Sequence, residues 1–347
     1  MSDVESKNVS ARAVESKQLD ETVSHIESPI PFDQELKEPL ISILKKLPKP
    51  LTPGLISLSR EQTIIASLSD EEIRCNGDFS FLEIDIPGPK NSPNISLIIC
   101  VPTATPGPYP IIYNIHGGGM VAGNNRTAEL AGELMRAKEL QLAIVAVNYR
   151  LAPENPDPAP IEDCYAGLIW LSENAYTYKL NPKQIIISGN SAGGGLAAGV
   201  TLLARDRGYP NIIGQMLQCP MLDDRCETFS ANQLKDVGVW DTYSNITAWN
   251  ALLGVRRGSD NVSCYAAPAR AKDLSELPPA FIDVGAVEAL RDDAINYANR
   301  IWQCGGEAEL HIWSGAFHSF DQWVPDAIVS KAANQTRISW IQRILNR

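Results

Sequence analysis

Residues 185–193 read Ile185-Ile186-Ile187-Ser188-Gly189-Asn190-Ser191-Ala192-Gly193. The apolar run at 185–188 predicts a short buried strand, and the small residues of 192–205 predict a helix directly after it. Between them, residues 189–193 fit the pattern G-x-S-x-G. A strand, a strained turn and a helix form the setting of a nucleophile elbow, which raises the serine at the helix N-terminus. Ser191 is therefore the candidate nucleophile of an α/β protein.

Two other interpretations of this stretch exist. The glycines could serve an ordinary turn, with Ser191 capping the helix. Residues 193–198 also fit the dinucleotide fingerprint G-x-G-x-x-A. That fingerprint would lie inside the predicted helix, and no strand ending in an acidic residue follows about 20 positions later. The partner motifs elsewhere in the chain favour the nucleophile elbow.

A triple glycine lies upstream. His116-Gly117-Gly118-Gly119 directly follows the predicted strand 111–115. Ester hydrolysis passes through an oxyanion that backbone N–H groups must approach closely, and glycine permits this approach. We expect the donors to be Gly118 and Gly119 together with Ala192, the residue after the nucleophile, with Gly117 as the alternative loop donor. We expect His116 to orient the loop by hydrogen bonds.

A serine nucleophile needs an imidazole base, and the chain has four histidines. His25 lies in a polar leading segment, His116 belongs to the glycine loop, and His311 lies within a predicted strand as a core or edge residue. His318 follows the last predicted strand in a loop. The resulting order of serine, acid and histidine is that of α/β-hydrolases. His318 is the candidate base.

The candidate acid follows the predicted strand 280–284. It must leave the strand end within a few residues to reach His318. Glu288 meets this requirement, whereas Asp292 and Asp293 would lie on the next helix. We predict Glu288 as the acid, with Asp292 as the alternative.

Strands and helices alternate through most of the chain. The predicted strands are 81–86, 96–101, 111–115, 142–149, 185–188, 216–219, 280–284 and 309–312, and the predicted helices 127–138, 161–173, 192–205 and 326–345. This order predicts an α/β fold with a mostly parallel central sheet flanked by helices, after antiparallel strands near the start.

Two regions interrupt the alternation. Residues 1–70 comprise a polar start, disordered or loosely helical over 1–30, followed by short amphipathic helices broken by prolines. Residues 223–265 are rich in tryptophan and polar side chains. We predict that these two regions form a helical cap, and that 71–222 and 266–347 form the two parts of the core.

Composition limits the partners. The net charge of −11 argues against nucleic-acid binding, which needs clustered Lys and Arg. We expect no signal peptide and no membrane span, because no apolar run approaches about 18 residues. The seven cysteines are odd in number and lack CxxC spacing, which favours free thiols and a cytoplasmic protein. Since the ligand residue types show no metal spacing along the sequence, we expect no metal and no cofactor.

These motifs together resemble the hormone-sensitive-lipase group of α/β-hydrolase esterases over roughly 110–318. The resemblance extends to Tyr149-Arg150-Leu151-Ala152-Pro153-Glu154, Pro268-Ala269-Arg270-Ala271, Leu277-Pro278-Pro279 and Arg291-Asp292. The family usually has Asp where this chain has Glu288, and often Asp where it has Asn190. The resemblance implies a cap over the site, with Trp240, Trp249 and Met120 as candidates for either pocket lining or cap core.

The expected activity is hydrolysis of carboxylic esters of short to medium acyl chain, or of lactones, through an acyl-enzyme. Two alternatives stay open. An acyltransferase or lactone-forming enzyme would use the same triad. A non-catalytic small-molecule receptor, as in the plant gibberellin receptor that resembles this family, would have lost the histidine, whereas this chain keeps His318. A homodimer through an edge strand or helices is compatible with the sequence.

Overall fold

The computed structural model describes residues 28–47 and 49–347. Its centre is an eight-stranded sheet in the order β1-β2-β4-β3-β5-β6-β7-β8. The strands are β1 (Phe79–Ile86), β2 (Ile95–Pro102), β3 (Tyr109–Ile115), β4 (Ala143–Asn148), β5 (Leu180–Asn190), β6 (Gly214–Gln218), β7 (Ala280–Gly285) and β8 (Ala308–Trp313). Strand β2 pairs antiparallel with β1 and β4, and every pairing from β4 to β8 is parallel. The predicted fold class is therefore confirmed.

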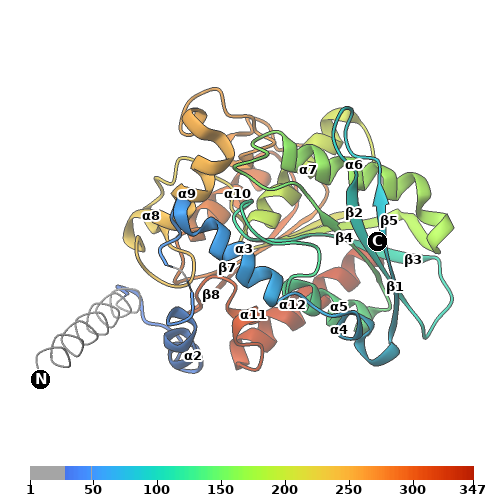
Figure 1. Ribbon diagram of the computed structural model, residues 1–347, viewed down its shortest axis with the longest axis horizontal. Coiled ribbons are helices and arrows are strands. Elements are labelled where there is room, and N and C mark those ends of the chain that lie inside the picture. The colour runs from blue at the N-terminus through green and yellow to red at the C-terminus, as the bar shows by residue number, and fades with distance from the viewer. Residues whose placement is uncertain (1–27, 48) are drawn as a thin grey trace, which may run out of the picture.

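Helices cover both faces of this sheet (Figure 1). One layer consists of α6 (Ala159–Asn174), α7 (Ala192–Arg207) and α10 (Arg291–Gln303), and the other of α4 (Asp70–Arg74), α5 (Glu129–Leu140) and α12 (Ile328–Leu345). Each layer packs on its own apolar cluster, because successive side chains of a strand point to opposite faces. Ile111 and Ile112 on β3 illustrate this division, since they belong to different clusters.

The remaining helices gather beyond the sheet, on the side labelled α2, α3, α8 and α9 in Figure 1. They are α2 (Gln34–Leu44), α3 (Ile56–Ile65), α8 (Phe229–Gln233) and α9 (Thr242–Leu253), with the short α11 (Phe320–Trp323) near them. The first four of these helices fall in the two regions that interrupt the predicted alternation, whereas α11 lies in 266–347, which we predict as core. The predictions for His25 and for most of 1–30 lie outside the described residues.

All eight predicted strands and all four predicted helices form, with boundaries that differ by a few residues. The largest difference is β5, which begins at Leu180 rather than near 185, because its first residues continue the pairing with β3. In the part of the chain that the structure describes, no helix combines the length and apolar character needed to cross a bilayer.

Candidate active site

The elbow after β5 has a strained backbone. Ser191 has φ 56° and ψ −118°, a backbone conformation that residues other than glycine rarely adopt. Its N–H donates to Gln218 O on β6 at 2.8 Å. A Cβ on Gly193 would lie 2.0 Å from the carbonyl oxygen of Ile115 on β3, so only glycine fits there. The two neighbouring strands thus fix Ser191 at the start of α7.

Ser191, His318 and Glu288 form one hydrogen-bonded chain although they come from loops after three different strands. With the ring proton on Nδ1, His318 donates to Glu288 Oε2 at 2.5 Å and accepts at Nε2 from Ser191 Oγ at 2.9 Å. The second carboxylate oxygen of Glu288 accepts from Gly285 N–H at 2.8 Å, which fixes the acid. All three side chains are buried.

Asp292, the alternative acid, faces elsewhere. Its Oδ2 accepts from Ser230 N–H at 2.7 Å, and its Oδ1 pairs with Arg291 at 2.8 Å. His311 lies in the edge strand β8 and pairs with Glu309 at 2.9 Å. The geometry therefore brings Glu288, not Asp292, to the base.

Opposing effects set the charge of the base. Burial alone lowers the pKa of His318, but its contacts with Cys219 and Glu288 outweigh burial and raise that pKa well above the usual 6.5. Because burial also raises the pKa of the Cys219 thiol, the carboxylate of Glu288 is the charge that acts on the imidazole at neutral pH. Glu288 thus favours the imidazolium that forms when a serine gives up its proton.

Two residues of the glycine loop, Gly118 and Gly119, line the pocket. Gly118 has φ +100°, and a Cβ there would lie 2.2 Å from Ala122 O. The N–H of Gly117 donates to Glu129 Oε2 at 2.8 Å, whereas the hydrogen bonds among the described residues use neither that of Gly118 nor that of Gly119. Ala192, as the first residue of α7, has an N–H without an intrahelical partner. These three N–H groups are available to an oxyanion.

Other side chains hold this loop from behind. His116 donates from Nδ1 to Gly117 O at 2.8 Å and stacks on Tyr149, with ring centroids 4.1 Å apart. Burial lowers the pKa of His116 to about 4, so its ring stays neutral. Arg60 on α3 donates to Val121 O at 2.7 Å. Sequence reasoning expected the role of His116 but missed Arg60, because no motif links a helix in the first 70 residues to the loop.

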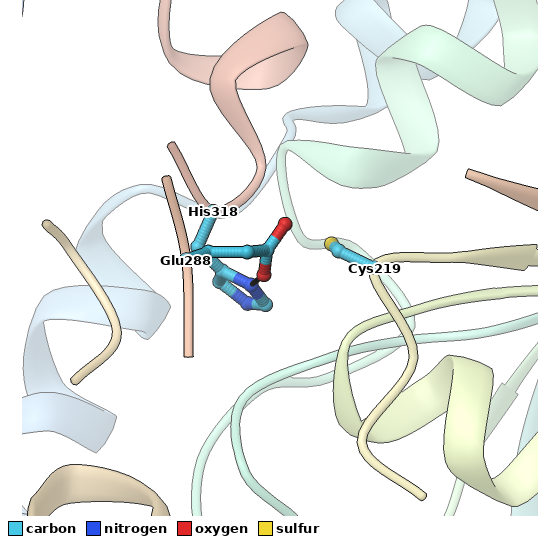
Figure 2. Close-up of side chains that lie close together, drawn as sticks. All are labelled: Cys219, Glu288 and His318. Carbon is cyan, nitrogen blue, oxygen red and sulfur yellow. Dashed lines mark hydrogen bonds and ion pairs between the residues drawn. The ribbon is translucent and has the colours of Figure 1, made fainter. Parts of the chain in front are cut away.

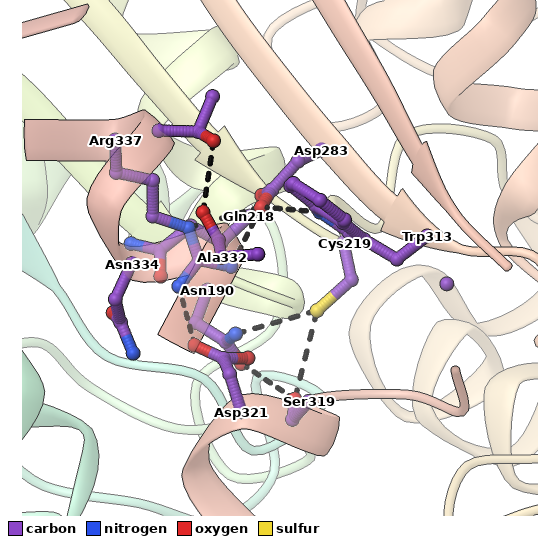
Figure 3. A network of polar contacts seen from close by, with 12 residues as sticks. Asn190, Gln218, Cys219, Asp283, Trp313, Ser319, Asp321, Ala332, Asn334 and Arg337 are labelled. Carbon is purple, nitrogen blue, oxygen red and sulfur yellow. Dashed lines mark hydrogen bonds and ion pairs between the residues drawn. The ribbon is translucent and has the colours of Figure 1, made fainter. Parts of the chain in front are cut away.

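A buried ion network supports the loop that carries His318 (Figure 3). Arg337 on α12 pairs with Asp283 on β7 at 2.7 Å and with Asp321, three residues after His318. Trp313 Nε1 also donates to Asp283, at 3.1 Å. These residues were missed in the sequence, where Arg337 looks like one more polar position of an amphipathic helix.

A pocket of about 490 Å³ opens onto this constellation. Its wall includes Ser191, His318, Gly118 and Gly119. Its other sides include residues from 46–47, 49–66, 239–244 and 322–323. Trp240 lines it and stacks near His318, with ring centroids 6.3 Å apart. Trp249 and Met120 instead belong to the main apolar core and are almost fully buried, so pocket lining is wrong for these two.

Comparison with known proteins gives a consistent family assignment. A family model described as alpha/beta hydrolase fold matches residues 112–322. The chain is 36% identical over 203 residues to carboxylesterase NlhH and 33% identical over 213 residues to esterase LipI, both of Mycobacterium tuberculosis. These matches cover 58% and 61% of this chain, and the chain spans 63% and 65% of those relatives.

Solved structures match over more of the chain. A bacterial heroin esterase superposes with a TM-score of 0.80 at 36% identity, covering 90% of this chain and 98% of its own. Esterase LipW of Mycobacterium marinum gives a TM-score of 0.81 at 27% identity, covering 91% and 96%. With the family model matching more than half of the residues, the chain belongs to the hormone-sensitive-lipase-like family of α/β hydrolases.

Proposed function

We propose that this protein is a carboxylesterase that hydrolyses esters of short to medium acyl chain, or lactones, through the triad Ser191, His318 and Glu288. The observation that carries this proposal is the hydrogen-bonded chain from Glu288 through His318 to Ser191, which ends in a pocket beside free N–H donors. Relatives named esterase and carboxylesterase support the reaction class.

In the proposed mechanism, Ser191 Oγ attacks the ester carbonyl while His318 Nε2 takes its proton. The N–H groups of Gly118, Gly119 and Ala192 stabilise the oxyanion. The imidazolium then gives its proton to the leaving alcohol, and the acyl group stays on Ser191. Water, deprotonated by His318, attacks this ester and releases the acid with the free serine.

The choice of substrate depends on the two helical regions over the pocket. We name residues 28–47 and 49–70, together with 223–265, the cap segments. A buried ion pair between Lys49 and Asp241, 3.1 Å apart, joins them, and Leu51 N–H donates to Ser244 Oγ at 2.9 Å. Their side chains Leu47, Leu51 and Trp240 give the pocket apolar walls. A cavity of about 490 Å³ is of the size that holds a small-molecule substrate.

The test is a chain-length series of p-nitrophenyl esters with wild type and Ser191→Ala. We expect kcat/KM to be highest for short to medium chains and to fall on the order of 10⁶-fold in the variant. Undiminished turnover by Ser191→Ala would disprove the mechanism. Turnover that rises steadily to long chains would disprove the substrate class only.

Acyl transfer to an alcohol uses the same triad and is the second candidate. It predicts that an added alcohol acceptor diverts most of the acyl-enzyme from free acid to new ester, whereas hydrolysis predicts free acid as the main product. The receptor alternative predicts ligand binding without turnover, and a competent base in His318 argues against it.

Compartment and assembly are separate parts of the proposal. The seven cysteines are free thiols, as suits a reducing cytoplasm. Strand β8 lies at the sheet edge with Ile312 45% exposed, and an edge strand of this kind can pair with a second copy. Cell fractionation and light scattering of Ile312→Lys against wild type would test these two points.

A further inference from the structure

A thiol lies beside the triad but has no part in the proposed reaction. Cys219 follows β6, Glu288 follows β7 and His318 follows β8, so neighbouring parallel strands bring the three side chains together. One donor atom from each lies within 4.8 Å of the other two. Figure 2 shows the thiol pointing toward the carboxylate of Glu288, with the imidazole beside both.

The position of this thiol is fixed by its surroundings. Cys219 has φ 37°, and its N–H donates to Asp283 O at 2.7 Å. Its Sγ accepts from Asn190 Nδ2 at 3.3 Å and lies 3.5 Å from Ser319 Oγ. Cys219 thus sits between the elbow and the loop of the base, and these contacts hold its sulfur near Glu288 and His318.

We propose that Cys219, Glu288 and His318 form an inhibitory site for a borderline-soft divalent cation such as zinc or cadmium. Thiolate, imidazole and carboxylate are the ligand types that zinc takes in proteins. With bonds of about 2.0–2.3 Å, donors around one tetrahedral ion stand roughly 3.5 Å apart, so small side-chain movements close this cluster around an ion.

The charges of the cluster suit a divalent ion. The thiolate and the carboxylate carry two negative charges and neutral imidazole carries none, so the filled site has no net charge in its buried setting. Binding releases the thiol proton to water. Oxygen-preferring magnesium and calcium lack this match.

An ion in this site prevents His318 from acting as the base. An ion on Nδ1 of His318 takes that lone pair, so the single proton of the neutral ring moves to Nε2. Nε2 then has no lone pair with which to accept the proton of Ser191, and the hydrogen bond to Glu288 is lost. The proposed route of entry is the substrate pocket, because His318 and Ser319 line it. Cys219 is 5% exposed, and its Sγ lies 3.5 Å from Ser319 Oγ.

The inhibition rests on the proposed esterase activity, so the experiment has two readouts. Zinc chloride is titrated against hydrolysis of p-nitrophenyl acetate by the full chain, with magnesium chloride as the comparison. We expect zinc to inhibit and chelator to restore activity, whereas magnesium has no effect. In Cys219→Ser the half-inhibitory zinc concentration should rise by roughly tenfold or more. Removing even an outer contact of a metal site typically lowers metal affinity by about this factor.

Cys226→Ser is the matched control. Cys226 is also buried and its Sγ accepts from an amide, Asn245 Nδ2, at 3.2 Å. This variant should keep the zinc sensitivity of the wild type. Equal zinc sensitivity of Cys219→Ser and wild type would overturn the proposal, as would loss of sensitivity in both cysteine variants.

The second readout does not need turnover. Cobalt chloride added to Ser191→Ala should give a thiolate-to-cobalt charge-transfer band, which should be absent when Cys219→Ser or Cys219→Ala is added to that variant. Circular dichroism shows whether each variant folds. If one of the two Cys219 variants does not fold, the cobalt spectrum of the other variant tests the site. A band that persists without Cys219 would overturn the site. A band that depends on Cys219 in a protein without esterase activity would support the site while the proposed function fails.

Discussion

Two parts of the molecule meet across one pocket but are built differently. One is the set of loops after β3, β5, β7 and β8, which we call the floor, and the other is the cap segments. The floor carries Ser191 and His318, each 5% exposed. The N–H of Ser191 donates to Gln218 O on β6, and His318 bonds both Glu288 and Ser191. The cap segments expose apolar side chains, including Ile64 at 67% and Ile65 at 84%. A rigid floor suits chemistry that tolerates little displacement. Cap segments that line the pocket but carry none of Ser191, His318 and Glu288 suit the choice of substrate, because a substitution there changes the pocket wall and not the reacting groups.

The sharpest test of the floor is its acid. Glu288→Ala should lower kcat on the order of 10⁴-fold, because His318 loses the carboxylate that fixes its tautomer and stabilises its charge. Glu288→Gln should also move the acid limb of the pH profile of kcat/KM to lower pH. The sign follows from the base, which must be neutral and whose pKa Glu288 raises above 6.5.

Asp292→Asn is the control for this prediction. Asp292 bonds Ser230 and Arg291, so its neutralisation should leave the pH profile unchanged. If Asp292→Asn abolished turnover while Glu288→Ala did not, the acid would be Asp292, and the hydrogen bond from His318 to Glu288 would not be the catalytic one.

The floor also predicts a stability difference along one helix. Arg337→Ala should cost about 3–5 kcal/mol of unfolding free energy, because it leaves Asp283 and Asp321 buried without their cation. Arg343, on the same helix, pairs with Glu309 and is 52% exposed, so Arg343→Ala should cost about 1 kcal/mol or less. Urea unfolding of both variants measures the contrast, and equal losses would contradict it.

The same contrast explains how far the sequence predicts the molecule. The elbow and the glycine loop are contiguous motifs whose backbone geometry only glycine allows, so they are visible in the sequence, and the order of strands and helices follows from periodicity. Cys219 reaches the site because parallel strands align ends that are distant in the chain, whereas Glu129 and Arg337 reach it because α5 and α12 pack on the sheet. No spacing rule indicates them.

The cap is the least predictable part for a related reason. Trp240 and Trp249 are nine positions apart, and composition treats them alike. Trp240 precedes α9 and lines the pocket, whereas Trp249 lies on the inward face of α9, in the core. Which tryptophan meets the substrate depends on the position of α9 over the sheet, and this position depends on long-range packing.

The cap prediction therefore concerns Trp240. Trp240→Ala should enlarge the pocket beside His318 and change the ratio of kcat/KM between long and short acyl esters by roughly tenfold in favour of the long ones. Trp323 lines the same pocket but is 45% exposed, and Trp323→Ala should change that ratio less. If kcat instead fell equally for all chain lengths, Trp240 would act on the floor rather than on the choice of substrate. It would then hold His318 or Gly119 in position.

The smallest expected effect lies where floor and cap meet, at Glu129. Its carboxylate accepts from Gly117 N–H, and His318, Glu133 and Asp321 are the charged groups that face it. Burial raises the pKa of Glu129 to about 7, from 4.5 in an unfolded chain. Ionisation therefore costs stability as pH rises from 4.5 to 7, and the cost is complete above that range.

Glu129→Gln keeps an acceptor for Gly117 and removes the charge, so it should be more stable than wild type at alkaline pH, with the gain vanishing below pH 4.5. The full pKa shift of Glu129 would correspond to about 3 kcal/mol of unfolding free energy. The gain in Glu129→Gln should be well below this value, because Glu129 lines a pocket that water can fill. Glu154→Gln is a control of opposite sign, since Arg60 lowers the pKa of Glu154 to about 2. Thermal unfolding across pH measures both. A Glu129→Gln protein less stable than wild type at alkaline pH would mean that the loop needs the charge and not merely an acceptor.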